Sequence, residues 1–380
     1  MAGVSAYRHL PGGSGRRAPQ TFGLTQVPMA AETAFVLYRW LLTEYNNPAA
    51  PLTTCRLLLS PTESEISARP EIAEVAEACT LDHFLRDSTE WRRDASDDNA
   101  NVTVLYLAGH ALERHREEQI VLMEDFGDGI GPLLRNSIST ANIFNGMAPA
   151  GRQRNIALTQ LYFFDMGRTR AVESARTELM SPSLVFDVEF SNLADPRSAV
   201  IFYASSSGQM AYGYSGGPTL FGDALLACLR GGAGRREEQA DGGEAWVVSV
   251  HSLARALPMY VDRIAAAAEI EQRVVIGGSV NEAIVHYLPG PPPVEVALRV
   301  DPAAAHACTW VKIWNTADEL AFEGRPPAPG DTFTLPAGVY RIVVETTAPT
   351  AWATPKPRWI VVEPPEHSIK VALTDAAPAQ

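Results

Sequence analysis

VTVLYLAGHA (Val102–Ala111) and LTQLYFFDMGR (Leu158–Arg168) are the two stretches that decide the fold. Each contains a nearly continuous apolar run, which is typical of a strand buried on both faces of a sheet. His110 follows the first run, and Asp165 and Gly167 lie at the end of the second. Because the carboxyl ends of parallel strands meet at one edge of a sheet, we expect these residues to lie close together.

Strands and helices alternate around these runs, up to about Leu288. The expected elements are a helix at 30–46, strands at 56–60, 120–123, 199–204 and 246–250, and helices at 220–229 and 253–268. This alternation predicts an α/β fold in which a mostly parallel sheet is flanked by helices.

A proline-rich segment, Pro289–Pro293, interrupts the pattern. Proline cannot continue a helix or a central strand, so the segment indicates a stiff linker. From Val294 onward, short runs alternate apolar and polar residues and are separated by turn residues, which predicts a small antiparallel β-sandwich. We therefore expect two domains, at 1–289 and 290–380.

The bulk composition excludes several classes of protein. The chain has 380 residues and a formal net charge of −13, which argues against nucleic-acid or anionic-membrane partners, since both are bound by clustered Lys and Arg. No apolar run approaches the roughly 20 residues that span a bilayer, and Met1–Leu10 lacks the apolar core of a signal peptide. The four cysteines form no CxxC pair. We therefore expect no metal, no cofactor and a cytoplasmic protein.

Two of the strand-end residues each allow two interpretations. His110 could move a proton near neutral pH at the sheet edge, or it could be a half-exposed histidine with no role. Asp165 could receive a positively charged side chain, or it could cap a helix that starts near Thr169.

Four segments resemble motifs of the bacterial caspase-like peptidases, and they occur in the same order along the chain. VLYLAGHAL is similar to the histidine motif of that family, a hydrophobic strand ending in A-G-H-G, and FFDMGRTR is similar to its nucleophile motif, D-x-C-R. GVSAYRHLPGG resembles the end of the first strand and its loop. YASSSGQMAYGYSGGPTLFGDALLACL resembles a late strand, the substrate-pocket loop and a helix. In caspases the histidine also precedes the cysteine by about 50 residues. The resemblance implies a caspase-like fold over residues 1 to about 280.

The same resemblance assigns roles to individual positions. Gly167 stands where the family has its cysteine nucleophile, so the dyad with His110 is incomplete. Ala111 stands where the family usually has glycine, at the backbone N–H that helps to form the oxyanion hole, and alanine resists a positive φ. Members with an acidic residue at the position of Asp165 cleave after Arg or Lys, which implies an ancestral basic preference.

The resemblance implies a cysteine endopeptidase homologue that is inactive with Gly167. It is either a natural pseudoenzyme or a sequence in which a native cysteine has been replaced. Alternatives are an enzyme that uses Ser205, Ser206 or Ser207, and a non-catalytic protein-binding scaffold. A flavodoxin-like domain is disfavoured because no glycine-rich phosphate loop follows an early strand. The expected partner is a protein or peptide, and the oligomeric state stays open.

Overall fold

The computed structural model describes residues 1–115, 118–149, 155–168, 181–187, 195–214, 216–239, 242–347 and 352–375. The helix expected near Thr169 lies outside these residues. Contacts divide the chain into two compact units, residues 1–226 with 257–283 and residues 227–256 with 284–380. The expected domain boundary at 289/290 stays a prediction.

A six-stranded sheet forms the centre of the first unit, in the order β11-β8-β7-β3-β1-β2. Its strands are β1 (Ala2–Val4), β2 (Leu58–Ser60), β3 (Val102–Gly109), β7 (Thr159–Met166), β8 (Ser198–Tyr203) and β11 (Val275–Gly278). Neighbouring strands from β2 to β8 are parallel, and β11 is antiparallel at its edge. The mostly parallel α/β fold is therefore confirmed.

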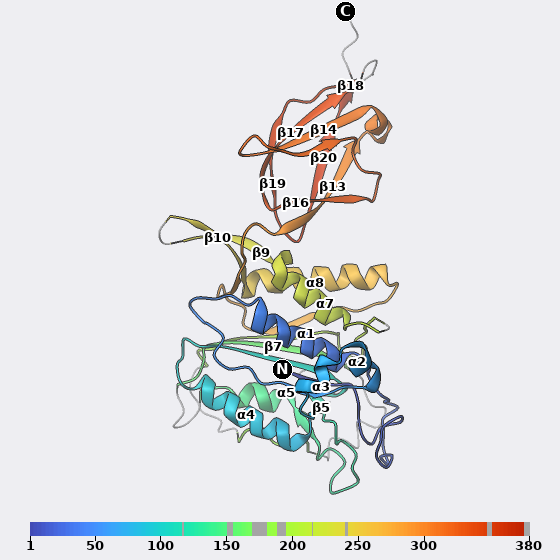
Figure 1. Ribbon diagram of the computed structural model, residues 1–380, viewed down its shortest axis with the longest axis vertical. Helices are drawn as coiled ribbons and strands as arrows, with labels where there is room; N and C mark the ends of the chain where they lie inside the picture. The colour runs from blue at the N-terminus through green and yellow to red at the C-terminus, as the bar shows by residue number, and fades with distance from the viewer. Residues whose placement is uncertain are drawn as a thin grey trace, which may run out of the picture. The chain divides into compact units, whose positions relative to one another are not determined.

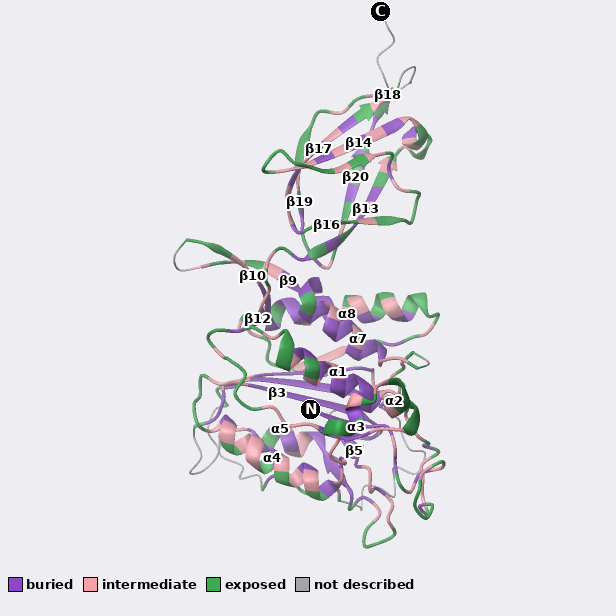
Figure 2. Cartoon of the chain, in the orientation of Figure 1, coloured by how far each residue is buried: buried purple, intermediate pink, exposed green. Residues whose placement is uncertain are grey.

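The two apolar runs form adjacent strands, β3 and β7, which are buried along most of their length (Figure 2). Their register pairs Val102 with Thr159 at one end and Gly109 with Met166 at the other. The next residue after each strand is therefore His110 in one case and Gly167 in the other, at the same edge of the sheet.

Helices cover both faces of this sheet (Figure 1). One face carries α1 (Ala30–Thr43) and α7 (Leu220–Ala227), and the other carries α4 (Leu81–Ala95) and α5 (Thr140–Gly146). The close approach of α1 to β1 requires a glycine, because a Cβ at Gly3 would lie 2.4 Å from the carbonyl oxygen of Ala30. The other α-helices described are α2 (Glu63–Ala68), α3 (Glu71–Val75) and α8 (Val250–Ala267).

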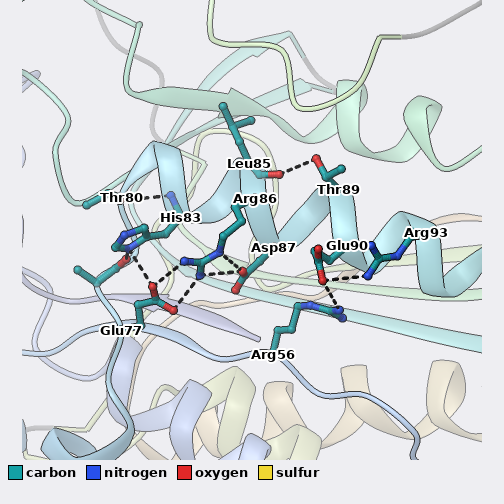
Figure 3. Close-up of polar contacts among 11 residues, drawn as sticks. Arg56, Glu77, Thr80, His83, Leu85, Arg86, Asp87, Thr89, Glu90 and Arg93 are labelled. Atoms are coloured by element: carbon teal, nitrogen blue, oxygen red, sulfur yellow. Dashed lines mark hydrogen bonds and ion pairs between the residues drawn. The ribbon is translucent and has the colours of Figure 1, made fainter.

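The exposed face of α4 carries a network of charged side chains (Figure 3). Arg86 donates to both carboxylate oxygens of Glu77 at 2.8 Å and to Asp87 at 2.8 Å. At the start of the helix, the Thr80 hydroxyl accepts from the backbone N–H of His83 at 3.4 Å. These pairs lie at the surface, where water screens them, so each adds little to stability.

A small antiparallel sheet begins where β3 ends. It contains β4 (Ala111–His115), β5 (Glu118–Leu122) and β6 (Ser137–Ser139). Ala111 lies opposite Val121, and the N–H of Leu122 donates to the carbonyl of His110 at 3.0 Å. This makes Ala111 and Val121 a non-hydrogen-bonded pair, so the N–H of Ala111 points away from β5.

The second unit contains the β-sandwich. One sheet has the order β16-β13-β20 and the other β15-β14-β17-β19. The strands are β13 (Pro293–Asp301), β14 (Thr309–Asn315), β15 (Leu320–Gly324), β16 (Thr332–Pro336), β17 (Gly338–Thr346), β19 (Arg358–Val362) and β20 (Glu366–Ala372). Alternate residues of both sheets, including Val296, Ile313, Ile342 and Ile369, form one buried core.

The sandwich differs from the expected one in one pairing. β13 and β20 run parallel, whereas a purely antiparallel arrangement was expected. The chain crosses from β19 in one sheet to β20 in the other, and a crossover between sheets permits parallel pairing. The remaining strands of this unit are β9 (Gly234–Glu238), β10 (Glu244–Ser249), β12 (Ile284–Tyr287), β18 (Trp352–Ala353) and β21 (Thr374–Asp375).

Candidate functional site

Two residues from the N-terminal segment hold His110 at the end of β3. The backbone N–H of His110 donates to the Tyr7 hydroxyl at 2.6 Å, and its Nε2 lies 2.7 Å from the carbonyl oxygen of Thr25. A carbonyl oxygen only accepts hydrogen bonds, so Nε2 carries the proton and Nδ1 is the basic nitrogen of the neutral ring. The His110 ring also packs against the Tyr7 ring, with centroids 5.1 Å apart.

Gly109 allows Tyr7 to reach His110. Gly109 has a φ of +145°, and a Cβ at this position would lie 2.6 Å from the Tyr7 hydroxyl and 3.0 Å from the carbonyl oxygen of Val4. Any other residue would be strained and would displace Tyr7. The glycine before the histidine is therefore required by both the backbone and the neighbouring tyrosine.

The environment of His110 favours its neutral form. Burial lowers the pKa of His110 from its ordinary value of 6.5, against a smaller opposite effect of the Thr25 carbonyl. The imidazole is therefore neutral near pH 7. A neutral imidazole with an unprotonated Nδ1 is the form that can accept a proton from a nucleophile.

Gly167 lies next to His110 across the sheet edge and has no side chain to offer. A Cβ at Gly167 would lie 3.2 Å from the backbone nitrogen of Ala211 and 3.3 Å from the Cα of Met210. Contacts this short require the loop to move by a few tenths of an ångström. The position can therefore hold a small side chain if the loop at residues 205–211 adjusts.

A buried ion pair fixes that loop next to Gly167. Nη2 of Arg168 lies 3.6 Å from Oε1 of Glu113, and both side chains are buried. Glu113 also accepts from the Ser207 hydroxyl at 2.6 Å and from the N–H of Gly208 at 2.9 Å. These contacts tie β4, the end of β7 and the loop to one another.

Ala111 adopts an ordinary backbone conformation. It is the first residue of β4, and its φ is not positive. The positive φ at this turn belongs to Gly109 instead, so alanine introduces no strain. The N–H of Ala111 points away from β5 and accordingly stays available on the side opposite that strand.

Asp165 is buried beneath the helices that cover one face of the sheet. Its Oδ2 accepts hydrogen bonds from the hydroxyls of Tyr106 and Thr219. Its Oδ1 is buried and has no partner among the residues that the structure describes. Burial raises the pKa of Asp165 to about 6, although the bonds from Thr219 and Tyr106 act in the opposite direction.

Gly222 makes room for this arrangement. A Cβ there would lie 2.0 Å from Cγ2 of Thr33, 2.8 Å from Oγ1 of Thr219 and 3.4 Å from the Tyr106 hydroxyl. The backbone N–H of Gly222 also donates to Oγ1 of Thr219 at 3.0 Å. The first turn of α7 therefore orients the threonine hydroxyl toward Asp165.

Four of the other hydroxyl and thiol groups are poorly suited to act as nucleophiles. The Ser205 hydroxyl is buried and donates to the carbonyl of Met166 at 3.2 Å, and that of Ser207 donates to Glu113. Burial raises the thiol pKa of Cys55 and of Cys79, which opposes thiolate formation. These observations disfavour Ser205, Ser207, Cys55 and Cys79 as nucleophiles, and the alternative of a serine enzyme that uses Ser206 stays a prediction.

The described residues contain neither a metal-binding cluster nor a helix that could span a membrane. No group of three or more His, Cys, Asp or Glu side chains in this part of the chain could hold a metal ion. No helix within the same residues is both long and apolar enough to cross a bilayer.

His110, Ala111 and Gly167 all lie at the same edge of the sheet, directly after β3 and β7, and the roles assigned to them stay predictions. Sequence reasoning missed Tyr7, Thr25 and Glu113. Tyr7 and Thr25 lie in irregular segments far from the apolar runs, and no pattern links them to the histidine. Glu113 follows the histidine by three residues, and its burial in β4 was the missing information.

This chain has little similarity to known proteins in sequence or in fold. No family model matches the chain, and no curated protein matches it. Among solved structures, caspase-1 from Spodoptera frugiperda is similar with a TM-score of 0.37 and 10% identity, over 76% of this chain and 88% of that one. The Bacillus anthracis TIE protein is similar with a TM-score of 0.19 and 13% identity, over 28% of this chain and 21% of that one.

Proposed function

We propose that the first unit is a caspase-like site that binds peptides at a basic residue and lacks the nucleophile needed to cleave them. The observation that carries the proposal is the register that pairs Gly109 with Met166. This register brings the residues that follow the two strands, His110 and Gly167, to the same edge of the sheet, which supports a dyad between His110 and a thiol at position 167. Without a thiol, His110 has no group to deprotonate, so the chain is inactive as a cysteine peptidase.

The basic preference is supported by Asp165. A buried carboxylate oxygen without a partner is unfavourable, and a bound ammonium or guanidinium group would satisfy it. The carboxylate is also held in place by Tyr106 and Thr219, so it would not need to reorganise on binding. An Arg or Lys side chain of a peptide fits this chemistry.

Binding can be tested without catalysis. We expect acetyl-arginine-amide to bind the full chain in titration calorimetry, and acetyl-citrulline-amide, which has the same shape without the charge, to bind at least tenfold more weakly. Asp165→Asn should remove that difference. Equal binding of the two compounds would contradict the basic pocket while leaving the dyad geometry untouched.

Catalysis is tested at position 167. Gly167→Cys should hydrolyse arginyl and lysyl peptide reporters, and Gly167→Ala, which introduces the same Cβ, should not. His110→Ala in the Gly167→Cys background should abolish the gain, because no base would remain to activate the thiol. A folded Gly167→Cys protein that is inert while still binding arginine would favour the alternative, a non-catalytic scaffold for protein binding.

A further inference from the structure

The edge strand β19 of the sandwich presents two large apolar side chains to solvent. Trp359 is 58% exposed and Val361 is 52% exposed, at alternate positions of a five-residue strand. Ile360 and Val362 point to the other face, where they contribute to the sandwich core. The apolar surface gathered on one face of this strand therefore marks an interaction site.

Trp359 and Val361 each lie beside side chains of the neighbouring strands, and these cross-strand neighbours form two rows on the outer face of the sheet. The antiparallel register places Trp359 beside Arg341 and Arg341 beside Trp314. Val361 lies beside Val339 in the next row. Trp and Arg are enriched among the residues that dominate binding energy in protein interfaces. The composition of the rows thus suits contact with another protein.

The backbone of β19 is open on one side. Within the described part of the sandwich, β19 pairs with β17 alone. Proline residues bound the strand at Pro357 on one side and Pro364 on the other, and proline has no N–H to donate to a ladder. The prolines therefore limit backbone pairing to the few residues between them. This restricts the register in which another strand can pair with β19.

The two exposed apolar residues of the strand are placed symmetrically about its central residue, Ile360. Trp359 and Val361 lie one residue to each side of it, and Pro355 and Pro365 lie five residues to each side. If two copies of the strand pair antiparallel with Ile360 opposite Ile360, each Trp359 faces the Val361 of the other copy. An aromatic residue opposite a β-branched residue is a favourable cross-strand pair. Each end of the ladder then meets Pro357 of one copy and Pro364 of the other.

We propose that β19 is the contact through which two copies of this chain dimerise. The two four-stranded sheets join edge to edge about a two-fold axis at Ile360, and the Trp359–Val361 pair forms twice. A two-fold contact of this kind uses the same surface in both copies, so it closes at two and does not grow into a filament. Pairing also covers the open edge, which would otherwise promote aggregation.

The test is the mass of the full chain in solution, measured by sedimentation over a roughly hundredfold concentration range. We expect a reversible dimer. Trp359→Glu and Val361→Lys should each weaken it at least tenfold, because each replaces one side of both cross-strand pairs with a charge. Leu320→Lys is the matched control on the opposite edge strand, β15, and should leave the dimer unchanged.

Mixing the two charged variants tests the register. One Trp359→Glu chain and one Val361→Lys chain place Glu opposite Lys in one pair and keep Trp opposite Val in the other. A mixed dimer should therefore form although neither variant dimerises alone. Three outcomes would overturn the two-fold pairing. The parent chain could stay monomeric at every concentration, the dimer could survive both single substitutions, or the two variants could fail to associate when they are mixed. Near-ultraviolet circular dichroism checks that each variant is folded.

Discussion

The backbone N–H of His110 donates to the hydroxyl of Tyr7 at 2.6 Å, although 103 residues separate the two. Tyr7 is fully buried, its hydroxyl lies against the glycine turn before His110, and its backbone N–H donates to Oε1 of Gln26 at 2.6 Å, in the loop that also carries Thr25. The position of the imidazole thus depends on the N-terminal segment as much as on the strand that carries the histidine.

Tyr7→Phe should lower stability and move His110. Loss of the hydroxyl leaves a buried backbone N–H without its partner, which costs about 1–3 kcal/mol in the free energy of unfolding. Urea denaturation measures that loss, and the nuclear magnetic resonance signal of the His110 imidazole reports the displacement. Tyr162→Phe is the control, since it removes another buried hydroxyl, bonded to Gln160 at 2.6 Å. An unchanged His110 signal in Tyr7→Phe would contradict the positioning role.

His110 should titrate below the ordinary histidine value of 6.5, because burial lowers its pKa. The unfolded chain then binds a proton at a higher pH than the folded chain, so stability is lost as pH falls below about 6.5. Resonance titration of the imidazole measures the pKa directly. His110→Gln should reduce the acid sensitivity of the denaturation midpoint, and a His110 pKa at or above 6.5 would contradict the prediction.

Asp165 should have the opposite pH dependence. Burial raises its pKa from 3.8 to about 6, which corresponds to about 3 kcal/mol between the two protonation states. The folded chain retains the proton over this range while the unfolded chain loses it, so the contribution of Asp165 to stability falls as pH rises from about 4 to about 6.

Asp165→Asn removes that titration. The variant should therefore gain stability relative to the parent protein between about pH 4 and pH 7, by up to about 3 kcal/mol. Paired urea denaturation curves at the two pH values measure the gain. A constant difference between the two proteins across this range would show that Asp165 has an ordinary pKa.

Glu113→Gln should be strongly destabilising. It removes the charge of Glu113 from beside the buried Arg168 guanidinium, and removal of one partner of a buried ion pair typically costs about 3–5 kcal/mol. The loop at residues 205–211 also loses its charged acceptor. Glu77→Gln is the surface control. Glu77 pairs with Arg86 (Figure 3), both side chains are exposed, and the denaturation midpoint should not move measurably. Similar losses for both variants would contradict the role of burial.

Limited proteolysis should separate two stable pieces within Leu288–Val294, where the proline-rich segment connects the domains expected from the sequence. Mass spectrometry of the fragments identifies the cleavage site. The contact-based units divide the chain elsewhere, at residues 226/227, 256/257 and 283/284. Cleavage at those positions, with residues 284–294 left intact, would favour these units over a boundary in the linker.

The sequence by itself determined the strands of the main sheet and the residues at their ends. Apolar runs of strand length can only be buried on both faces, and that requirement identified β3 and β7 to within one residue. The parallel arrangement followed from the alternation with helices, and it placed His110 and Gly167 at a common edge. The proline cluster and the period-two pattern likewise indicated the sandwich.

Only the tertiary structure decided which residues from distant segments contact these strand ends. The hydrogen bonds that His110 donates to Tyr7 and Thr25 and the parallel pairing of β13 with β20 join segments far apart in the chain, and the ion pair of Glu113 with Arg168 depends on burial. Local patterns report which face of an element is buried but not which neighbour it meets. That choice is made by packing of the whole domain.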